Sequence, residues 1–176
     1  MNYANIKNYD IADGPGVRVS LFVSGCRHHC PGCFNEEAWD FNYGSEFTRE
    51  VEDDLLASLE PYYIRGLTLL GGEPLDPDNQ EAVCRFVRRV RERFPEKDIW
   101  CYTGYVWEKD IMGWMQEKCP HINELVSMID VLVDGPFIRE KKNISLLFRG
   151  SENQRLIDTA RSRKEGKAVI WREDKA

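Results

Sequence analysis

The chain has 176 residues, of which 42% are hydrophobic, and a net charge of −6. This length favours one domain spanning residues 1–176, and the acidic balance argues against a nucleic-acid partner or an anionic membrane surface. The N-terminal segment is polar and no run of about 18 apolar residues occurs, so we expect a cytoplasmic protein without a membrane span. Six cysteines in such a chain favour metal or redox chemistry over a disulfide framework.

Short apolar runs alternate with amphipathic segments along the chain, and this order predicts an α/β fold with a mainly parallel sheet. Arginines crowd residues 85–93, and we interpret them as the solvent-exposed side of an amphipathic helix rather than as a binding surface. In chain order we expect a strand at 17–24, a helix at 48–59 with Thr48 as its N-cap, a strand at 66–70, a helix at 78–94, a strand at 98–103, helices at 107–118 and 121–128, a strand at 129–134, and a last short strand or tail at 168–171.

The length of the chain limits the architecture. About five or six βα units fit at roughly 30 residues each, whereas a complete eight-stranded barrel needs about 200 residues or more. We therefore expect an incomplete, open parallel β/α barrel. From Phe137 onward the periodicity weakens, and residues 137–176 are expected to form a less regular C-terminal extension.

Four of the expected strands run into turns that carry chemically useful residues. Ligand sites in parallel α/β sheets gather at the carboxyl ends of the strands. We therefore expect these turns to line one common mouth. They are Gly25-Cys26, Gly71-Gly72-Glu73-Pro74, Thr103-Gly104-Tyr105 and Asp134-Gly135-Pro136.

Three cysteines, Cys26, Cys30 and Cys33, lie in the short stretch GCRHHCPGC. A loop this short can wrap three thiolates around one small inorganic body, and Pro31 and Gly32 suit the tight backbone path between the last two. A [4Fe–4S] cluster has four irons and usually takes four cysteines. Three ligands leave one iron open, and an open metal position is a site for chemistry.

A zinc site with His28 or His29 as the fourth ligand is the alternative interpretation of this loop. Zinc motifs more often pair their ligands as two separated hooks, and no second hook follows in this sequence. The other cysteines, Cys84, Cys101 and Cys119, are interpreted as small buried residues rather than as cluster ligands.

The cysteine spacing after a first strand resembles the radical-SAM superfamily, whose members use S-adenosylmethionine (SAM). Its neighbouring motifs are similar to those of the activating enzymes of glycyl-radical enzymes, and within that family to the branch that activates anaerobic ribonucleoside-triphosphate reductases. The similar stretches span nearly the whole chain in order: MNY, DGPGVR, LFVSGC, CPGCFN, LGGEPLDPDN, KDIW, TGY, VLVDG and RGSENQR.

The resemblance implies a [4Fe–4S] cluster on Cys26, Cys30 and Cys33, with SAM on the open iron. One electron from flavodoxin or a similar donor would cleave SAM, and the resulting 5′-deoxyadenosyl radical would take a hydrogen atom from a glycine of the large catalytic subunit of the reductase. The cofactor supplies the difficult step, so no catalytic side chain beyond the cluster is expected.

The resemblance also implies the contacts of SAM. Gly71, Gly72 and Glu73 resemble the family's site for the SAM amino group, because glycines allow close backbone approach and a carboxylate favours an ammonium. Gly32 and Phe34 flank Cys33, and the aromatic ring suits packing against adenine, although an ordinary packing role is equally open. The second-tier candidates are Thr103 and Asp134, of which Asp134 could instead cap a helix or turn.

The sequence departs from the family pattern at several points. Pro136 stands where a lysine commonly follows VLVDG, Glu73 stands where this branch often has Asp, and residues 137–147 match poorly. The stretch 149–155 is interpreted either as a docking or barrel-closing segment or as a polar loop that caps a helix. Two other functions stay open: activation of another glycyl-radical enzyme such as formate acetyltransferase, or a non-catalytic zinc or Fe–S binding module.

Overall fold

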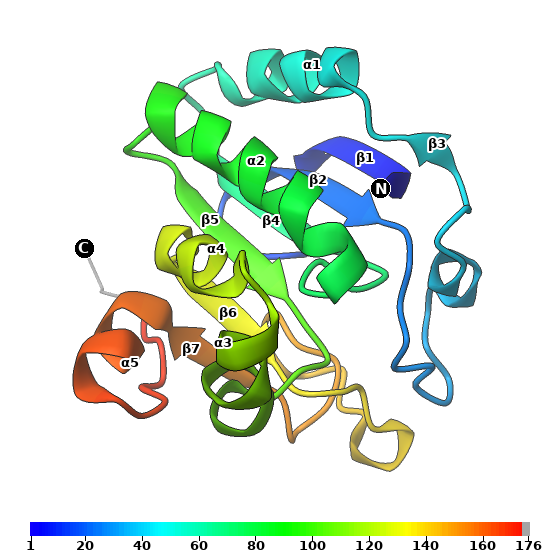
Figure 1. The fold of residues 1–176 in the computed structure, drawn as a ribbon, viewed down its shortest axis with the longest axis vertical. Coiled ribbons are helices and arrows are strands. Elements are labelled where there is room, and N and C mark those ends of the chain that lie inside the picture. The colour runs from blue at the N-terminus through cyan, green and yellow to red at the C-terminus, as the bar shows by residue number, and fades with distance from the viewer. Residues whose placement is uncertain (174–176) are drawn as a thin grey trace.

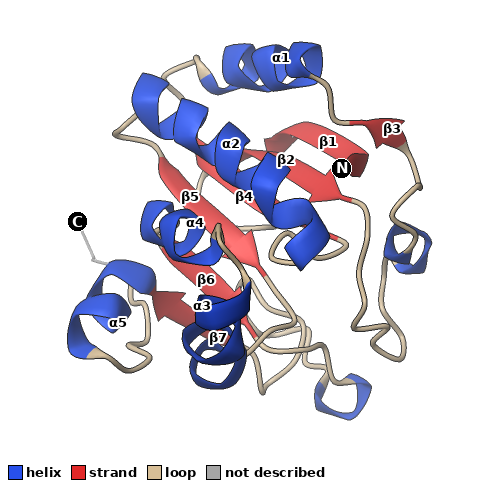
Figure 2. Cartoon of the chain, in the orientation of Figure 1, coloured by secondary structure: helices blue, strands red, loops and turns tan. Residues whose placement is uncertain are grey.

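A mixed seven-stranded sheet organises the chain (Figures 1 and 2), in a computed structural model that describes residues 1–173. Its strand order is β3-β1-β2-β4-β5-β6-β7. The strands are β1 (Asn2–Asp10), β2 (Val17–Val23), β3 (Ser45–Glu46), β4 (Ile64–Gly71), β5 (Asp98–Tyr102), β6 (Val131–Asp134) and β7 (Arg155–Asp158).

The centre of this sheet is parallel and its edges are antiparallel. Strands β2, β4, β5 and β6 pair in parallel register, while β1 and β7 pair antiparallel with β2 and β6. The predicted α/β class with a mainly parallel sheet is therefore confirmed. Within residues 1–173 the parallel core has four strands, fewer than the five or six βα units expected.

The helices follow the predicted order. They are α1 (Arg49–Leu59), α2 (Pro77–Arg93), a π-helical segment (Trp107–Trp114) that runs into α3 (Met115–Lys118), α4 (Ile122–Met128) and α5 (Thr159–Glu165), with 3₁₀ turns at Glu36–Trp39 and Arg139–Lys141. Thr48 caps α1 as expected, because its Oγ1 accepts a hydrogen bond from the Val51 amide at 3.3 Å. Helices α1, α2 and α4 lie over the same face of the sheet (Figure 1).

Side-chain alternation gives the two faces of the sheet different roles. In β5, Ile99 and Cys101 belong to the large apolar core that packs under the helices, while Trp100 belongs to a smaller cluster with Val131 and Val133 of β6. Successive side chains of a strand point to opposite faces, so this smaller cluster lies on the face away from the helices. Tyr102 and Phe148 pack against this cluster and also line a cavity.

Three strands, β1, β3 and β7, and one α-helix, α5, were not predicted. Strand β1 occupies the polar N-terminal segment, so 17–24 is the second strand and not the first. The C-terminal extension is more regular than expected, because β7 and α5 fold there. The expected last strand at 168–171 is reduced to a single bridge between Ile157 and Ile170.

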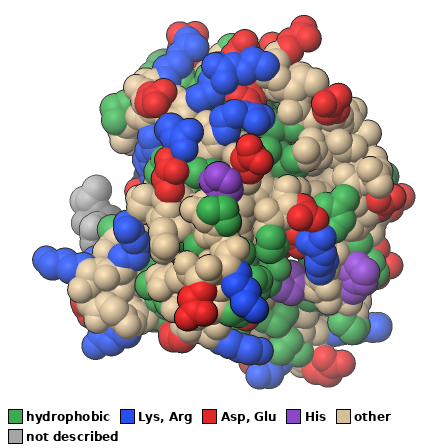
Figure 3. Space-filling view, viewed as in Figure 1, with side chains coloured by type: hydrophobic (Ala, Val, Ile, Leu, Met, Phe, Trp, Pro, Cys, Tyr) green, Lys and Arg blue, Asp and Glu red, His purple; other side chains and the backbone are tan. Residues whose placement is uncertain are grey.

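The arginines of α2 are engaged in ion pairs with neighbouring elements. Blue and red side chains lie next to one another over α1 and α2 in Figure 3. This arrangement confirms the interpretation of the segment as the polar side of a helix. The pairs are Arg85 and Arg89 with Glu52, Arg88 with Glu124, Arg91 with Asp130, and Arg93 with Glu60. None of the helices within residues 1–173 has the length and apolar character to cross a membrane.

Candidate active site

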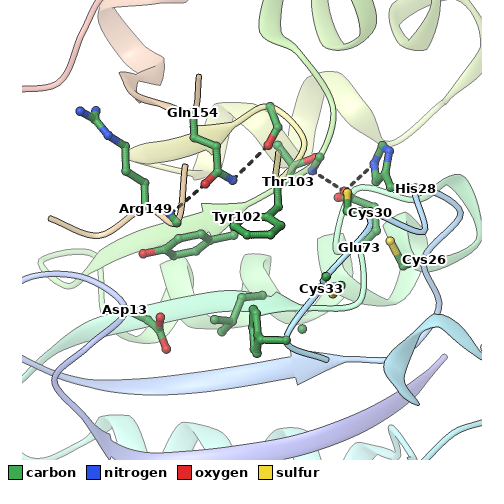
Figure 4. A pocket seen from close by; sticks show the side chains of 18 of the residues that line it. Asp13, Cys26, His28, Cys30, Cys33, Glu73, Tyr102, Thr103, Arg149 and Gln154 are labelled. Carbon is green, nitrogen blue, oxygen red and sulfur yellow. Dashed lines mark hydrogen bonds and ion pairs between the residues drawn. The ribbon is translucent and has the colours of Figure 1, made fainter. Parts of the chain in front are cut away.

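A cavity of about 450 Å³ opens where the parallel strands end (Figure 4). Its wall includes residues from all four turns that follow β2, β4, β5 and β6, which confirms the expected common mouth. The volume lies in the range of small-molecule sites, about 300–1,000 Å³. Lining residues from the four turns are Cys26, Gly71, Gly72, Glu73, Thr103, Gly104 and Gly135.

The cysteine loop presents all three predicted thiols to this cavity. Cys26, Cys30 and Cys33 line it, and none forms a disulfide. The Cys33 amide donates to the Cys30 carbonyl at 3.0 Å, and Gly32 between them has a φ of +75°. This is the geometry of a type II turn, which favours Pro31 at its second position and glycine at its third. The predicted role of Pro31 and Gly32 in the backbone path is thus confirmed.

Burial favours the protonated form of two of these thiols, Cys26 and Cys30, in the free protein. It raises the pKa of Cys26, which is 8% exposed, to about 12, and it also raises the pKa of Cys30. Thiolate is the form that binds metal. Metal or cluster binding at these residues must therefore release protons.

The arrangement fits a cluster better than a single zinc ion. Within residues 1–173, no three Cys, His, Asp or Glu side chains converge on a point that one ion could occupy. His28 Nε2 lies 3.0 Å from Glu73 Oε2, and His29 stacks on Trp39 with 4.6 Å between ring centroids. Both imidazoles therefore have partners other than the cysteines. Three free thiols on the wall of a roomy cavity instead suit a larger body with an open position.

The remaining cysteines are buried away from this site, as predicted. Cys84, Cys101 and Cys119 are almost fully buried, and none of them lines the cavity.

The Gly71-Gly72-Glu73 turn packs directly against the start of the cysteine loop. The Gly72 amide donates to the Val23 carbonyl at 2.7 Å, and the Glu73 amide donates to the Gly25 carbonyl at 2.8 Å. A Cβ on Gly72 would lie 2.6 Å from that Gly25 oxygen, so any side chain at this position would collide. Glycine is required here by backbone packing, before any ligand is considered.

The predicted ligand residues of the cavity differ in how available they are. Phe34 is 82% exposed at the rim, so it is not an ordinary core residue. Thr103 lines the wall, where its Oγ1 accepts from the Tyr105 amide at 3.1 Å. Glu73 is 1% exposed and its carboxylate already has protein partners.

Asp134 has a structural role in this arrangement. Its carboxylate accepts from the Trp107 amide at 2.9 Å and pairs with Arg155, and the residue is not among those that line the cavity. The helix-capping alternative therefore describes Asp134 best.

Several residues that were not predicted as ligands also line the cavity wall. They are Asp13, Tyr102, Arg149 and Gln154. In Figure 4, Asp13 lies on the opposite side of the view from the cysteines. Asp13 opens the DGPGVR stretch, whereas Arg149 and Gln154 belong to RGSENQR, so these two stretches were the available signals.

Comparisons with known proteins support the same assignment. A family model described as "4Fe-4S single cluster domain" matches residues 12–157. The chain is 43% identical over 156 residues to the "Anaerobic ribonucleoside-triphosphate reductase-activating protein" of Escherichia coli (strain K12), covering 88% of this chain and 96% of the relative. It is 44% identical over 156 residues to the protein of that name from Vibrio cholerae serotype O1, with the same coverage, and 44% identical over 158 residues to that of Enterobacteria phage T4, covering 89% and 93%. The chain therefore belongs to the 4Fe–4S single-cluster domain family and, within it, to the anaerobic ribonucleoside-triphosphate reductase-activating proteins.

Proposed function

We propose that this protein activates an anaerobic ribonucleoside-triphosphate reductase by reductive cleavage of SAM at a [4Fe–4S] cluster. The observation that carries the proposal is the meeting of three free cysteines with the Gly71-Gly72-Glu73 turn on the wall of one cavity. The names of the three relatives reported above support the identity of the target.

Cys26, Cys30 and Cys33 would hold the cluster as thiolates. When bound, the cluster would supply the electron that splits SAM into methionine and a 5′-deoxyadenosyl radical, which would take one hydrogen atom from a glycine of the large subunit and leave 5′-deoxyadenosine and a glycyl radical. A carbon radical is indiscriminate, so the protein's task is to hold the reacting groups close and to exclude competitors.

The other residues of the cavity would bind and orient SAM. Gly71 and Gly72 line the cavity, where their backbone would contact the ligand, and the charge of Glu73 favours a nearby ammonium. Phe34 at the rim would pack against adenine, beside Gly32. Thr103 would contribute a polar group on the wall, and Asp134 would act from behind the wall, by holding the Trp107 amide and Arg155.

The proposal also includes an electron donor, a location and an architecture. Flavodoxin or a similar one-electron donor would reduce the cluster. The six free cysteines agree with a reducing cytoplasm. We interpret the sheet as the core of an incomplete barrel of the radical-SAM type, since helices cover one face (Figure 1) and Tyr102 and Leu70 line the cavity.

The alternatives are less well supported. The reported relatives are named for the reductase and not for formate acetyltransferase. A zinc module would need a fourth ligand, and His28 and His29 both have partners other than the cysteines.

The direct test is anaerobic reconstitution with iron and sulfide, followed by reduction and addition of SAM with the reductase. We expect 5′-deoxyadenosine together with a glycyl-radical doublet in the EPR spectrum of the reductase. A parallel reaction with formate acetyltransferase should give no doublet. If a fully loaded, reduced cluster yields no 5′-deoxyadenosine, the proposal is wrong.

The ligand assignment has its own test in Cys30→Ala. This change removes one of three thiolates, so we expect the variant to lose cluster binding and SAM cleavage together, as measured by iron content and 5′-deoxyadenosine. Cys84→Ala is the matched control, because that buried cysteine lies outside the cavity, and it should keep both. Full cleavage by Cys30→Ala would exclude Cys30 as a ligand.

A further inference from the structure

The buried carboxylate of Glu73 connects three of the turns around the cavity. Its Oε1 accepts from the Leu75 amide at 2.9 Å, within its own turn. Its Oε2 accepts from the Gly104 amide at 2.7 Å and lies 3.0 Å from His28 Nε2 in the cysteine loop (Figure 4). Ionised carboxylates offer about four acceptor positions, so three of them are already used by the protein.

The imidazole of His28 is held from its other sides by the turn that follows β5. Its ring centroid lies 4.5 Å from that of Tyr105 in an edge-to-face arrangement. A Cβ on Gly104 would lie 2.5 Å from His28 Cδ2, so the ring fills space that only glycine leaves free. His28 thus belongs to the cysteine loop, while its side chain lies between the turn of Glu73 and the turn of Gly104.

We infer that the contact between His28 and Glu73 is a positioning device, which fixes the cysteine loop against the neighbouring turns so that Cys26 and Cys30 stay placed for the cluster. His28 lies between these two cysteines in sequence, so its side chain anchors the loop from within. Groups that orient ligand residues from outside the ligand set commonly change metal affinity by about 10- to 100-fold when they are removed. The inference rests on the proposed function for the presence of the cluster. It adds a role for Glu73 that does not depend on SAM.

The adjacent histidine provides a control within the same loop. His29 stacks on Trp39 and has a φ of +47°, and it makes no recorded contact with Glu73. His29→Asn removes the ring while keeping a residue that tolerates this backbone conformation.

The experiment measures how fast the reconstituted protein loses iron to a chelator, with no SAM present. We expect His28→Ala and Glu73→Gln to lose iron about tenfold faster than the unmodified protein. His28→Gln should stay within about twofold of it, because the glutamine amide can donate from nearly the position of Nε2. His29→Asn should also stay within about twofold. The double variant of His28→Ala with Glu73→Gln should lose iron no faster than Glu73→Gln alone, since the contact between His28 and Glu73 is the one that both changes disrupt.

A second readout separates positioning from general stability. The reduction potential of the cluster, followed by EPR without SAM, should change in His28→Ala and return toward the original value in His28→Gln, because charge and hydrogen bonds near a cluster set its potential. Circular dichroism of the cluster-free protein shows whether Glu73→Gln folds. If it does not fold, the comparison of His28→Ala with His28→Gln tests the inference by itself.

Two results would overturn the inference. One is a His28→Ala variant that retains its iron as long as the unmodified protein. The other is a His29→Asn variant that loses iron as fast as His28→Ala. Because SAM is absent throughout, failure here leaves SAM cleavage by the unmodified protein as a separate question.

Discussion

The carboxyl group of Asp13 lies on the cavity wall and has a strongly raised pKa. Burial is the main cause that raises its pKa to about 7, and the nearby carboxylate of Asp10 raises it further, while Lys7 acts in the opposite direction. Asp10 itself has a lowered pKa although burial opposes this, because Asp13 and the Ala12 amide, which donates to Asp10 Oδ1 at 2.9 Å, favour the ionised form. The pKa values of these two neighbouring carboxyl groups are thus shifted in opposite directions.

The raised pKa of Asp13 predicts a pH-dependent stability. The folded pKa of Asp13 lies above the ordinary value of 3.8, so the folded state binds more protons between these values and its stability falls as the pH rises from about 4 to about 7. Asp13→Asn cannot lose a proton, so we expect a smaller fall, measured by urea unfolding of the cluster-free protein at about pH 5 and about pH 7.5. Asp54→Asn, on the exposed side of α1, should keep the original dependence. An identical fall in Asp13→Asn and the unmodified protein would contradict the raised pKa of Asp13.

For the candidate site, the sequence predicted which residues line the cavity more reliably than which of them already have partners within the protein. The cysteines and the Gly71-Gly72-Glu73 turn do line one cavity. The sequence could not show that the Glu73 carboxylate is buried among amides, or that Asp134 pairs with Arg155. Those partners lie 21 to 31 residues away along the chain, and only folding brings them together.

At the scale of elements, the core strands and helices could be predicted but the edges could not. Strands β2, β4, β5 and β6 are largely buried and read as apolar runs, and the face of α2 has helical spacing. Strand β1 is mostly exposed or half-buried, so it lacks the alternation that marks a strand. Strand β7 has only four residues and forms by pairing with β6, so its own sequence is too short to mark it as a strand.

The RGSENQR stretch is an element whose role the structure clarifies. Gln154 Oε1 accepts from the Gly150 and Ser151 amides at 2.9 and 3.1 Å, and its Nε2 donates to the Gly135 carbonyl at 3.1 Å. Asn153 donates to the Pro136 carbonyl at 2.8 Å. These bonds fasten the C-terminal stretch to the turn after β6, so Asn153 and Gln154 have a structural role there, while docking by the other side chains of the stretch stays a prediction.

Removing the Gln154 amide should loosen this connection. Gln154→Ala loses three hydrogen bonds, and because each contributes about 0.5–1.5 kcal/mol net, we expect the Gly150 and Ser151 amides to exchange about tenfold faster or more. Hydrogen exchange followed by NMR measures this directly. Glu152→Gln is the control, since the recorded side-chain bond of Glu152 is to Asn143 on the surface. Unchanged exchange in Gln154→Ala would show that backbone packing alone holds the segment.

At the scale of the whole molecule, one buried arginine ties the central strands together on the face away from the helices. Arg18 of β2 is fully buried, and its Nε donates to Thr68 Oγ1 of β4 at 2.7 Å. Its guanidinium also pairs with Asp98 of β5 and lies over the ring of Trp100, 5.6 Å from the centroid. A charge inside the fold is tolerated only with such partners.

Loss of this charge should lower the stability of the whole domain. Arg18→Met leaves buried acceptors without a donor, and we expect the free energy of unfolding to fall by about 3 kcal/mol. Arg65→Met provides a matched control, because Arg65 contacts the same Asp98 but is about half exposed, and its loss should cost about 1 kcal/mol or less. Urea unfolding of the cluster-free variants tests the difference. Equal effects of the two changes would contradict a special role for the buried site.

The sequence by itself determined the α/β class, the order of the inner strands and helices, the cysteine loop and the turns that meet at one mouth. These features are local: apolar periodicity, an N-cap, a Pro-Gly turn and residues adjacent in the chain. Only the tertiary structure decided which of the polar groups are free to act. His28 and Glu73 lie 45 residues apart, and Arg18 of β2 reaches Asp98 of β5 across β4, so their partners depend on how the sheet assembles.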